Sequence, residues 1–250
     1  VVCHVMRAFA ALGLTLVAAC ASPPGPQPPG PAATRMVEFS NLRAHWFPAD
    51  LTSASGGPAI VALHGCGGLY DRQGRLAARY VETAARLNAR GIGVLFPDSF
   101  GSRGLGSQCV ARAGARAVTV ETRSEDLRLA LAWLAATPGV DGARVGLQAW
   151  SNGGTTALRA LERMQDQPTQ WVSLAGAALF YPRCTDALRR DAVLARAVPL
   201  LMQLGALDDW TAPQPCEALA RAQARQPRAQ TIVHVYPDSY HGFDGTEAVR

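Results

Sequence analysis

The chain has 250 residues, 48% of them apolar, so it is long enough for one sizeable domain with a buried core. Its formal net charge is +5, and all 24 basic residues are arginines scattered along the chain. They form neither a basic block nor a row interleaved with aromatic residues, so the charge indicates no nucleic-acid partner.

The N-terminal segment differs in composition from the rest of the chain. A basic start at Arg7 precedes an apolar run over residues 8–19, which is shorter than the roughly 20 residues of a membrane-spanning helix. This pattern predicts a signal peptide over residues 1–20. It resembles a bacterial lipoprotein signal, which is cut before a cysteine, here Cys20, that is then lipidated. Ordinary secretory cleavage near Ala21 is the alternative.

Residues 21–34 are rich in proline and glycine, which predicts an extended tether that holds the following domain off a membrane surface. From residue 35 to residue 250 we expect a single α/β domain. Short apolar runs alternate there with amphipathic segments, a pattern typical of a mostly parallel central sheet with helices on both faces.

The expected elements follow from this alternation in chain order. Strands are predicted at residues 58–65, 92–98, 143–150, 172–182, 199–205 and 231–237. Helices are predicted at residues 75–91, 121–137, 153–164 and 215–225. A fold of this kind normally adds one more helix after its last strand, so we expect the sequence to be truncated at its carboxyl end.

Four cysteines lie within the expected domain, and export would place them in an oxidising compartment, where disulfides persist. Cys66, Cys109, Cys184 and Cys216 allow three pairings. We favour Cys66 with Cys109 and Cys184 with Cys216, because each pair would join loops at the same end of the sheet. A free Cys66 thiol beside the functional site is the alternative.

One predicted strand ends in the segment AWSNG, with a serine at its centre. The segment resembles the G-x-S-x-G turn that presents a nucleophile between a strand and a helix, with Ala149 at the first glycine and Gly153 at the second. Ser151 would be the nucleophile. A serine hydroxyl is weak at neutral pH, so it needs a base and a group that orients the base. A helix N-cap is the alternative role for Ser151.

Loops after two later strands offer the base and the acid. His241 follows the last strand and has the position that a base needs. The remaining histidines lie in the signal region, near the first strand, in a glycine-rich loop and in mid-strand (His4, His45, His64 and His234). Asp208 and Asp209 follow the preceding strand, and consecutive side chains cannot both face one histidine. We favour Asp208, with a turn carboxylate that caps the next helix as the alternative.

The order Ser, Asp, His, each beyond a strand end, resembles the α/β-hydrolase arrangement. In that fold, the oxyanion is held by the N–H of the residue after the nucleophile and by an N–H from an HG-type loop. The segment LHGCGG, residues 63–68, then nominates the amides of Asn152 and Cys66. A glycine-rich turn without a catalytic role is the alternative.

These segments, together with FPDSFGSRG at residues 96–104, make the sequence similar to the dienelactone hydrolase family of α/β-hydrolases from residue 37 onward. The resemblance implies a hydrolase of carboxylic esters or lactones that uses no metal and no organic cofactor. The chain departs from the namesake enzymes by having Ser151 where they have a nucleophilic cysteine, and by having Ala149 in place of a glycine. The hydrolase class is unaffected, and we infer no particular substrate.

The sequence therefore predicts an exported, lipid-anchored serine hydrolase of the cell envelope that forms an acyl-enzyme with a small ester or lactone. An acyltransferase or a peptidase with the same three residues is one alternative. A catalytically silent envelope protein that binds a ligand is another.

Overall fold

The computed structural model describes residues 34–49, 56–111 and 115–245. The expected signal peptide, Cys20 and nearly all of the tether lie outside the described residues, as does the end of the chain from residue 246. Within the described ranges, no helix has both the length and the apolar character needed to cross a membrane.

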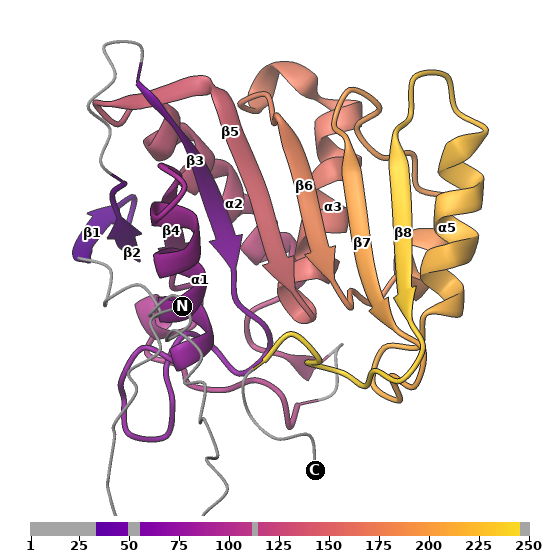
Figure 1. The fold of residues 1–250 in the computed structure, drawn as a ribbon, viewed down its shortest axis with the longest axis horizontal. Helices are drawn as coiled ribbons and strands as arrows, with labels where there is room; N and C mark the ends of the chain where they lie inside the picture. The colour runs from indigo at the N-terminus through magenta and orange to yellow at the C-terminus, as the bar shows by residue number, and fades with distance from the viewer. Residues whose placement is uncertain (1–33, 50–55, 112–114, 246–250) are drawn as a thin grey trace, which may run out of the picture.

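An eight-stranded sheet forms the centre of the domain, in the order β1-β2-β4-β3-β5-β6-β7-β8 (Figure 1). The neighbours from β4 to β8 pair in parallel, whereas β1 and β2 join the edge through antiparallel pairs. The strands are β1 (Arg35–Phe39), β2 (Leu42–Phe47), β3 (Gly57–Leu63), β4 (Gly93–Pro97), β5 (Val140–Trp150), β6 (Gly176–Phe180), β7 (Leu200–Gly205) and β8 (Thr231–Tyr236).

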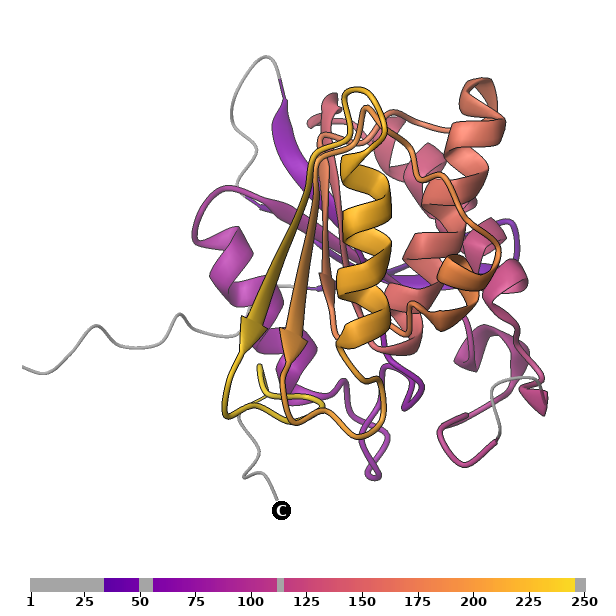
Figure 2. The same ribbon diagram turned by 90° about the vertical axis from the view of Figure 1, so that its right-hand side faces the viewer.

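Helices cover both faces of the sheet. Figure 2 shows the sheet nearly edge-on, with α1 on one side and with α3 and α5 on the other. The helices are α1 (Ala78–Asn88), α2 (Val120–Ala135), α3 (Asn152–Asp166), the short α4 (Thr185–Arg189) and α5 (Gln214–Ala224). The expected α/β fold, with a mostly parallel sheet between helices, is thus confirmed.

The alternation of side chains along the strands creates one apolar core on each face. In β3, Val61 and Leu63 belong to the core formed with α2 and α3, whereas Ala62 belongs to the core beneath α1. Successive side chains of a strand point to opposite faces, so a continuous apolar run serves a sheet that is covered on both sides. Tyr80 of α1 and Phe96 of β4 complete the second core.

The first helix is shorter than expected, because it begins at Ala78 rather than at residue 75. The carboxylate of Asp71 explains the difference. It accepts hydrogen bonds from the backbone N–H and from the side chain of Arg75, at 2.9 Å and 3.0 Å, and so holds Arg75 in the preceding turn. Such bonds from Asp to nearby backbone compete with helix formation.

The hairpin of β1 and β2 and the short helix α4 are not among the predicted elements. Ser40 and Asn41 connect the two strands, and both have a positive φ, 49° and 62°. Two such residues are typical of the tight hairpin turn whose twist matches that of antiparallel strands.

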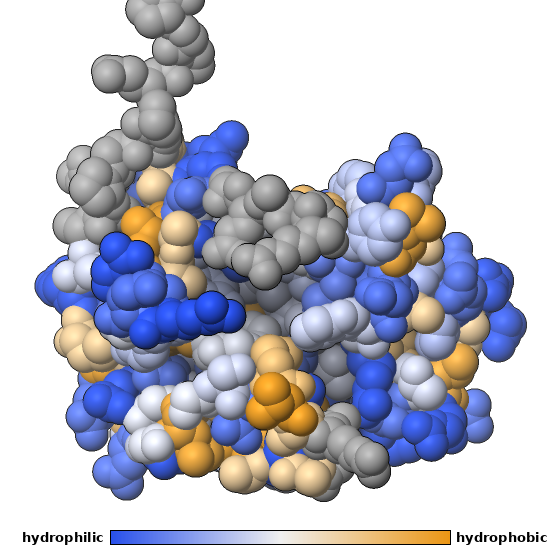
Figure 3. All heavy atoms as spheres, turned by 90° about the horizontal axis from the view of Figure 1, so that it is seen from below, coloured by the Kyte–Doolittle hydropathy of each residue, from blue (hydrophilic) through white to orange (hydrophobic). Residues whose placement is uncertain are grey.

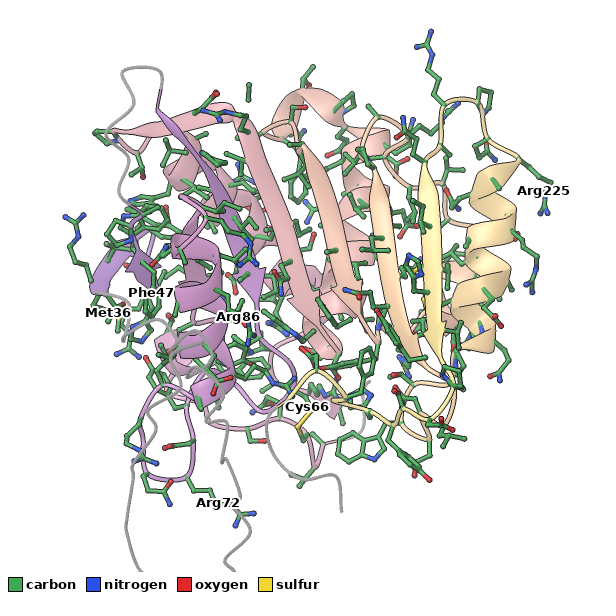
Figure 4. The ribbon with its side chains drawn as sticks, in the orientation of Figure 1. Met36, Phe47, Cys66, Arg72, Arg86 and Arg225 are labelled. Carbon is green, nitrogen blue, oxygen red and sulfur yellow. A yellow bond between two sulfur atoms is a disulfide. The ribbon has the colours of Figure 1, made fainter. Side chains whose placement is uncertain are left out.

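Two disulfides join the loops of the domain. They link Cys66 with Cys109 and Cys184 with Cys216, the two pairs favoured from the sequence. Figure 4 labels Cys66 beyond the carboxyl end of β3 and shows a disulfide there. Disulfides persist in oxidising compartments, so they indicate an exported domain.

The carboxyl ends of the parallel strands meet at one end of the molecule, at the bottom of Figure 1. The chain after β8 turns back beneath the sheet and runs towards the end of β5. The surface of this end is mainly hydrophilic, with smaller hydrophobic areas between (Figure 3). Loops that are distant in the sequence therefore converge where ligands bind in open α/β sheets.

Candidate active site

Ser151 lies on the sharp turn between β5 and α3. Its φ of 52° and ψ of −117° form a conformation that is costly for a side-chain-bearing residue and that is concentrated at functional sites. The turn brings α3 so close to β3 that a Cβ on Gly153 would lie 2.4 Å from the carbonyl oxygen of Leu63. The Ser151 hydroxyl makes no capping hydrogen bond to the helix, which argues against the N-cap alternative.

The structure brings together the three side chains nominated from the sequence. The Ser151 Oγ lies 2.9 Å from Nε2 of His241, and Nδ1 of His241 lies 2.8 Å from Oδ2 of Asp208. In the tautomer whose Nδ1–H donates a hydrogen bond to Asp208, Nε2 carries no proton and can accept the proton of the serine hydroxyl. The three groups can therefore act as nucleophile, base and orienting carboxylate.

Hydrogen bonds fix the carboxylate of Asp208 against the histidine. Its Oδ1 accepts from the backbone N–H groups of Trp210 and Thr211 at 2.9 Å and 2.8 Å, and its Oδ2 lies 2.8 Å from the Thr211 hydroxyl. Asp208 is only 5% exposed, whereas the neighbouring Asp209 is exposed. The two adjacent aspartates thus have different environments, and Asp208 alone of the two contacts His241.

Aromatic rings enclose the imidazole of His241. The ring of Trp210 stacks on it with centroids 5.3 Å apart, and the ring of Tyr181 lies at 4.5 Å. Tyr181 and Trp150 are buried in the core beneath α1. Trp210 is 65% exposed and lines the cavity beside Ser151. Of these three aromatic residues, only Trp210 therefore has a surface available to a ligand.

The loop that carries His241 is held from behind by the carboxylate of Asp244. This carboxylate accepts hydrogen bonds from Nε1 of Trp150 at 2.6 Å and from the hydroxyl of Tyr181 at 2.5 Å. Nη1 of Arg79 lies 3.5 Å from Oδ1 of Asp244 and completes the cluster. Trp150 directly precedes Ser151, so Asp244 links the histidine loop to the turn that presents the serine.

The backbone amides of Cys66 and Asn152 flank Ser151 on the other side. Both residues line the same cavity as Ser151 and His241, and a Cβ on Gly65 would lie 3.5 Å from the Cβ of Ser151. Within the part of the chain that the structure describes, neither N–H donates a hydrogen bond to the protein. Both amides are thus available to a ligand oxygen.

The side chain of Arg123, in the first turn of α2, lies behind these amides. Its Nη1 donates to Oδ1 of Asn152 at 2.6 Å, and its Nη2 donates to the carbonyl oxygen of His64 at 2.8 Å. Arg123 is 0% exposed, and the guanidinium lies 5.1 Å from the centroid of the Phe100 ring. Burial lowers the pKa of Arg123 to about 10, so the group stays protonated at neutral pH.

The loop of Cys66 is also tied to the rim of the cavity. The carbonyl oxygen of Cys66 accepts a hydrogen bond from the N–H of Gln108 at 2.8 Å, and the Cys66 sulfur is bonded to that of Cys109. The hydroxyl of Tyr80 lies 3.3 Å from the N–H of Gly65 and 3.3 Å from the carbonyl oxygen of Gly68. Because the Cys66 sulfur is bonded to Cys109, the site has no free Cys66 thiol.

The other histidines of the described ranges do not contact Ser151. His64 is fully buried, and both burial and the nearby charge of Arg123 hold its pKa well below the usual value, so its ring is neutral. His45 contacts the hydroxyl of Tyr70 at 3.0 Å, and His234 is exposed on β8.

A cavity of about 470 Å³ adjoins Ser151, and its wall is rich in arginine. Its charged lining residues are Arg116, Glu121, Arg159, Arg183, Asp186 and Arg190. Arg183 pairs with Asp186, and both Arg159 and Arg190 pair with Glu162 behind the wall. Arg116 has no carboxylate within 4.0 Å among the described residues, and burial and the charge of Arg183 lower its pKa. This wall would therefore attract an anionic group.

No group of three or more metal-ligating side chains, taken from His, Cys, Asp and Glu, occurs in the described part of the chain.

Sequence reasoning missed the residues that hold the site in place. Thr211 and Asp244 follow strand ends in loops, where nothing in the sequence distinguishes them from other polar residues. Arg123 does leave a signal. It lies one helical turn before Leu127, on the face that Leu127 and Leu131 bury, so it is a charged residue in line with an apolar stripe.

Comparison with known proteins agrees with this geometry. The model of the dienelactone hydrolase family matches residues 49–249. No match to the chain is found among curated proteins. A solved structure of a putative dienelactone hydrolase from Klebsiella pneumoniae is similar to this chain, at 18% identity and a TM-score of 0.65, over 84% of this chain and 88% of that one.

Two further solved structures share the fold. The dienelactone hydrolase-like promiscuous phosphotriesterase P91, from metagenomic libraries, has 20% identity and a TM-score of 0.64, over 86% of this chain and 85% of that one. Esterase 2 of Thermogutta terrifontis has 19% identity and a TM-score of 0.60, with the same coverage of 86% and 85%. At these identities the likeness concerns the fold, whereas the family model spans most of the sequence. The chain is thus a hydrolase by class and belongs to the dienelactone hydrolase family.

Proposed function

We propose that the protein is a serine hydrolase that cleaves a carboxylic ester or a lactone through an acyl-enzyme. The observation that carries this proposal is the hydrogen-bonded series from the Ser151 hydroxyl through His241 to Asp208. It stands at a strained turn beside a cavity of about 470 Å³, the size of a small-molecule site.

The reaction would take place in two steps. Ser151 Oγ bonds to the ester carbonyl carbon while its proton passes to Nε2 of His241, and Asp208 stabilises the imidazolium that forms. The bond to the leaving oxygen then breaks, and His241 returns the proton to that oxygen. Water adds to the acyl-enzyme in the same way, giving its proton to His241, and the carboxylic acid leaves as Ser151 is restored.

Negative charge develops on the carbonyl oxygen in both steps. The free amides of Cys66 and Asn152 would hold this oxyanion, in the role that preorganised backbone donors have in acyl transfer. The lining of the cavity supports this assignment, because Cys66 and Asn152 line it together with Ser151.

We propose further that the preferred substrate has an anionic group away from the reacting ester. Arg116 supports this proposal, since it has no carboxylate partner among the described residues, and burial together with the charge of Arg183 lowers its pKa. An anion bound there would relieve the repulsion between the two cations. The comparison of p-nitrophenyl hydrogen succinate with p-nitrophenyl butyrate tests it, because the two acyl chains have similar lengths but only the first ends in a carboxylate.

We expect kcat/KM to be about tenfold higher for the succinate, a difference of about 1.4 kcal/mol, and we expect Arg116→Met to remove this difference. Arg189→Met is the control, since Arg189 is an exposed arginine that pairs with Asp186 near the cavity wall but does not line the cavity. Equal kcat/KM values for the two esters in the wild type would refute the anionic preference.

For the whole protein, we propose a place in the cell envelope with a lipid on Cys20. The two disulfides support export, and residues 21–34 have the composition of a tether. Metabolic labelling with a radioactive fatty acid tests the anchor, because the label should be lost when Cys20 is replaced by serine.

Hydrolysis of p-nitrophenyl acetate by the purified protein tests the central proposal. We expect turnover without any added acceptor, and loss of turnover in Ser151→Ala. Turnover that requires an added alcohol or amine would favour an acyltransferase. A folded wild type without any turnover of short esters or peptides would favour the silent binding protein.

A further inference from the structure

The two amides proposed for the oxyanion belong to segments that are far apart in the sequence. Asn152 begins α3, and Cys66 lies in the loop after β3. One guanidinium contacts both segments, since Arg123 donates to Oδ1 of Asn152 at 2.6 Å and to the carbonyl oxygen of His64 at 2.8 Å. His64 is two residues before Cys66. The planar fork of arginine therefore sets the separation of the two segments.

The charge of this guanidinium is not cancelled by a contact with a carboxylate. Among the described residues no Asp or Glu lies within 4.0 Å of Arg123, and the nearby Asp126 is bonded through both its oxygens to Arg103. Burying a cation in this way is costly unless its surroundings compensate for the lost water. Neutral acceptors and the face of Phe100 compensate in part, so a net positive charge stays behind the amides.

We propose that Arg123 is a positioning residue of the oxyanion site, which holds the amides of Cys66 and Asn152 in register and adds an uncancelled positive charge behind them. This inference rests on the proposed function. In a site of low effective dielectric constant, a fixed cation stabilises an oxyanion more than it stabilises a neutral carbonyl group. The contribution of Arg123 therefore appears in the transition state and not in the binding of the ester.

A purely structural role would give a different pattern. If Arg123 only joined α2 to the sheet, its loss would lower stability without a selective effect on kcat. Arg163 provides the matched control, because it also anchors α2, through the Ser124 hydroxyl at 3.5 Å and the Glu125 carboxylate at 3.7 Å. Ser124 and Glu125 directly follow Arg123 on the same helix, and the pair of Arg103 with Asp126 stays intact in this variant.

The experiment compares Arg123→Met, Arg123→Lys and Arg163→Met with the wild type, using p-nitrophenyl acetate as the substrate. We expect kcat of Arg123→Met to fall about 100-fold, at the lower end of the loss seen when an oxyanion donor is removed, with KM changed less than about threefold. Lysine keeps the charge but cannot replace the fork, so we expect an intermediate loss for Arg123→Lys, about tenfold. Arg163→Met should keep kcat within about threefold.

A short alkyl trifluoromethyl ketone supplies a second measurement, because serine adds to its carbonyl carbon and leaves an oxyanion. Its inhibition constant should rise in Arg123→Met by about the factor by which kcat falls, as expected for a ligand that resembles the transition state. A loss confined to KM, a loss matched by Arg163→Met, or an unchanged inhibition constant would overturn the role of Arg123.

The two proposals fail in distinguishable ways. If the wild type does not hydrolyse the ester, the proposed function fails. If the wild type does so and the folded Arg123→Met has the same kcat, only the role of Arg123 fails. Should Arg123→Met not fold, Arg123→Lys decides, since a kcat equal to that of the wild type would overturn the inference.

Discussion

Two sides of Ser151 are stabilised by opposite kinds of charge. On the base side, the loop of His241 is held by the carboxylate of Asp244, which pairs with Arg79 and accepts from two aromatic side chains. On the side proposed for the oxyanion, Arg123 contacts the segments of the two amides and has no carboxylate partner among the described residues.

The difference follows the charge that each side would carry during the reaction. In the proposed reaction the base side would gain a proton, and Asp208 lies there to balance the imidazolium. The Asp244 carboxylate that holds this side is neutralised by Arg79, so it positions the loop of His241 without adding a strong electric field. The side proposed for the oxyanion would gain a negative charge, and Arg123, which holds it, is cationic. The comparison indicates that side-chain contacts fix the geometry on both sides of Ser151, whereas a net positive charge is added only on the side of Arg123.

The largest expected effect concerns the group that orients the base. Asp208→Asn should lower kcat for p-nitrophenyl acetate by about 10⁴-fold, because the amide favours the wrong tautomer of His241. Asp209→Asn is the matched control one residue away, and its kcat should stay near that of the wild type, since Asp209 is exposed. Equal losses in the two variants would contradict the assignment of Asp208.

The next largest effect is expected from the loss of Asp244, which holds the loop of His241. Asp244→Ala removes the acceptor that joins Trp150 and Tyr181, so the loop of His241 should loosen and kcat should fall about 10- to 100-fold, the scale expected when a catalytic group is misplaced by about 1 Å. Asp238→Ala, at an exposed position of the same loop, should leave kcat unchanged. An Asp244→Ala enzyme with full activity would mean that the histidine loop holds its own geometry.

The smallest effect separates the two disulfides. Replacing Cys66 and Cys109 together by alanine should lower kcat up to about tenfold, because the loop of the Cys66 amide loses its link to the rim. Replacing Cys184 and Cys216 together should leave kcat unchanged at 25 °C. Each double variant should lose roughly 2–4 kcal/mol of unfolding free energy in a denaturant titration. Equal kcat losses in both would show that the disulfides act only through stability.

Much of this fold could be predicted from the sequence, because apolar runs and helical periodicity report burial directly. The strands β3 to β8 are each predicted at the same place in the chain, with ends that differ by a few residues. The start of α1 was predicted three residues early, since periodicity does not reveal that Asp71 holds Arg75 in a turn. The hairpin of β1 and β2 depends on two residues with positive φ, which the sequence does not mark.

The residues of the site likewise differ in whether they could be predicted from the sequence. Ser151, Asp208 and His241 could be nominated because each follows a strand and their order resembles a known arrangement. Asp244 and Thr211 could not, because their roles depend on how loops fold back in space. Arg123 is an intermediate case, since its position on the stripe of Leu127 and Leu131 was visible but its two acceptors were not.

The central claim is that the Ser151 hydroxyl is made reactive by His241. The most direct measurement is covalent labelling with a fluorophosphonate, followed by mass spectrometry of the labelled peptide. We expect one label per folded molecule, attached to Ser151, and no labelling of His241→Ala at the same reagent concentration. A label on another residue, or a folded wild type that stays unlabelled, would contradict the account.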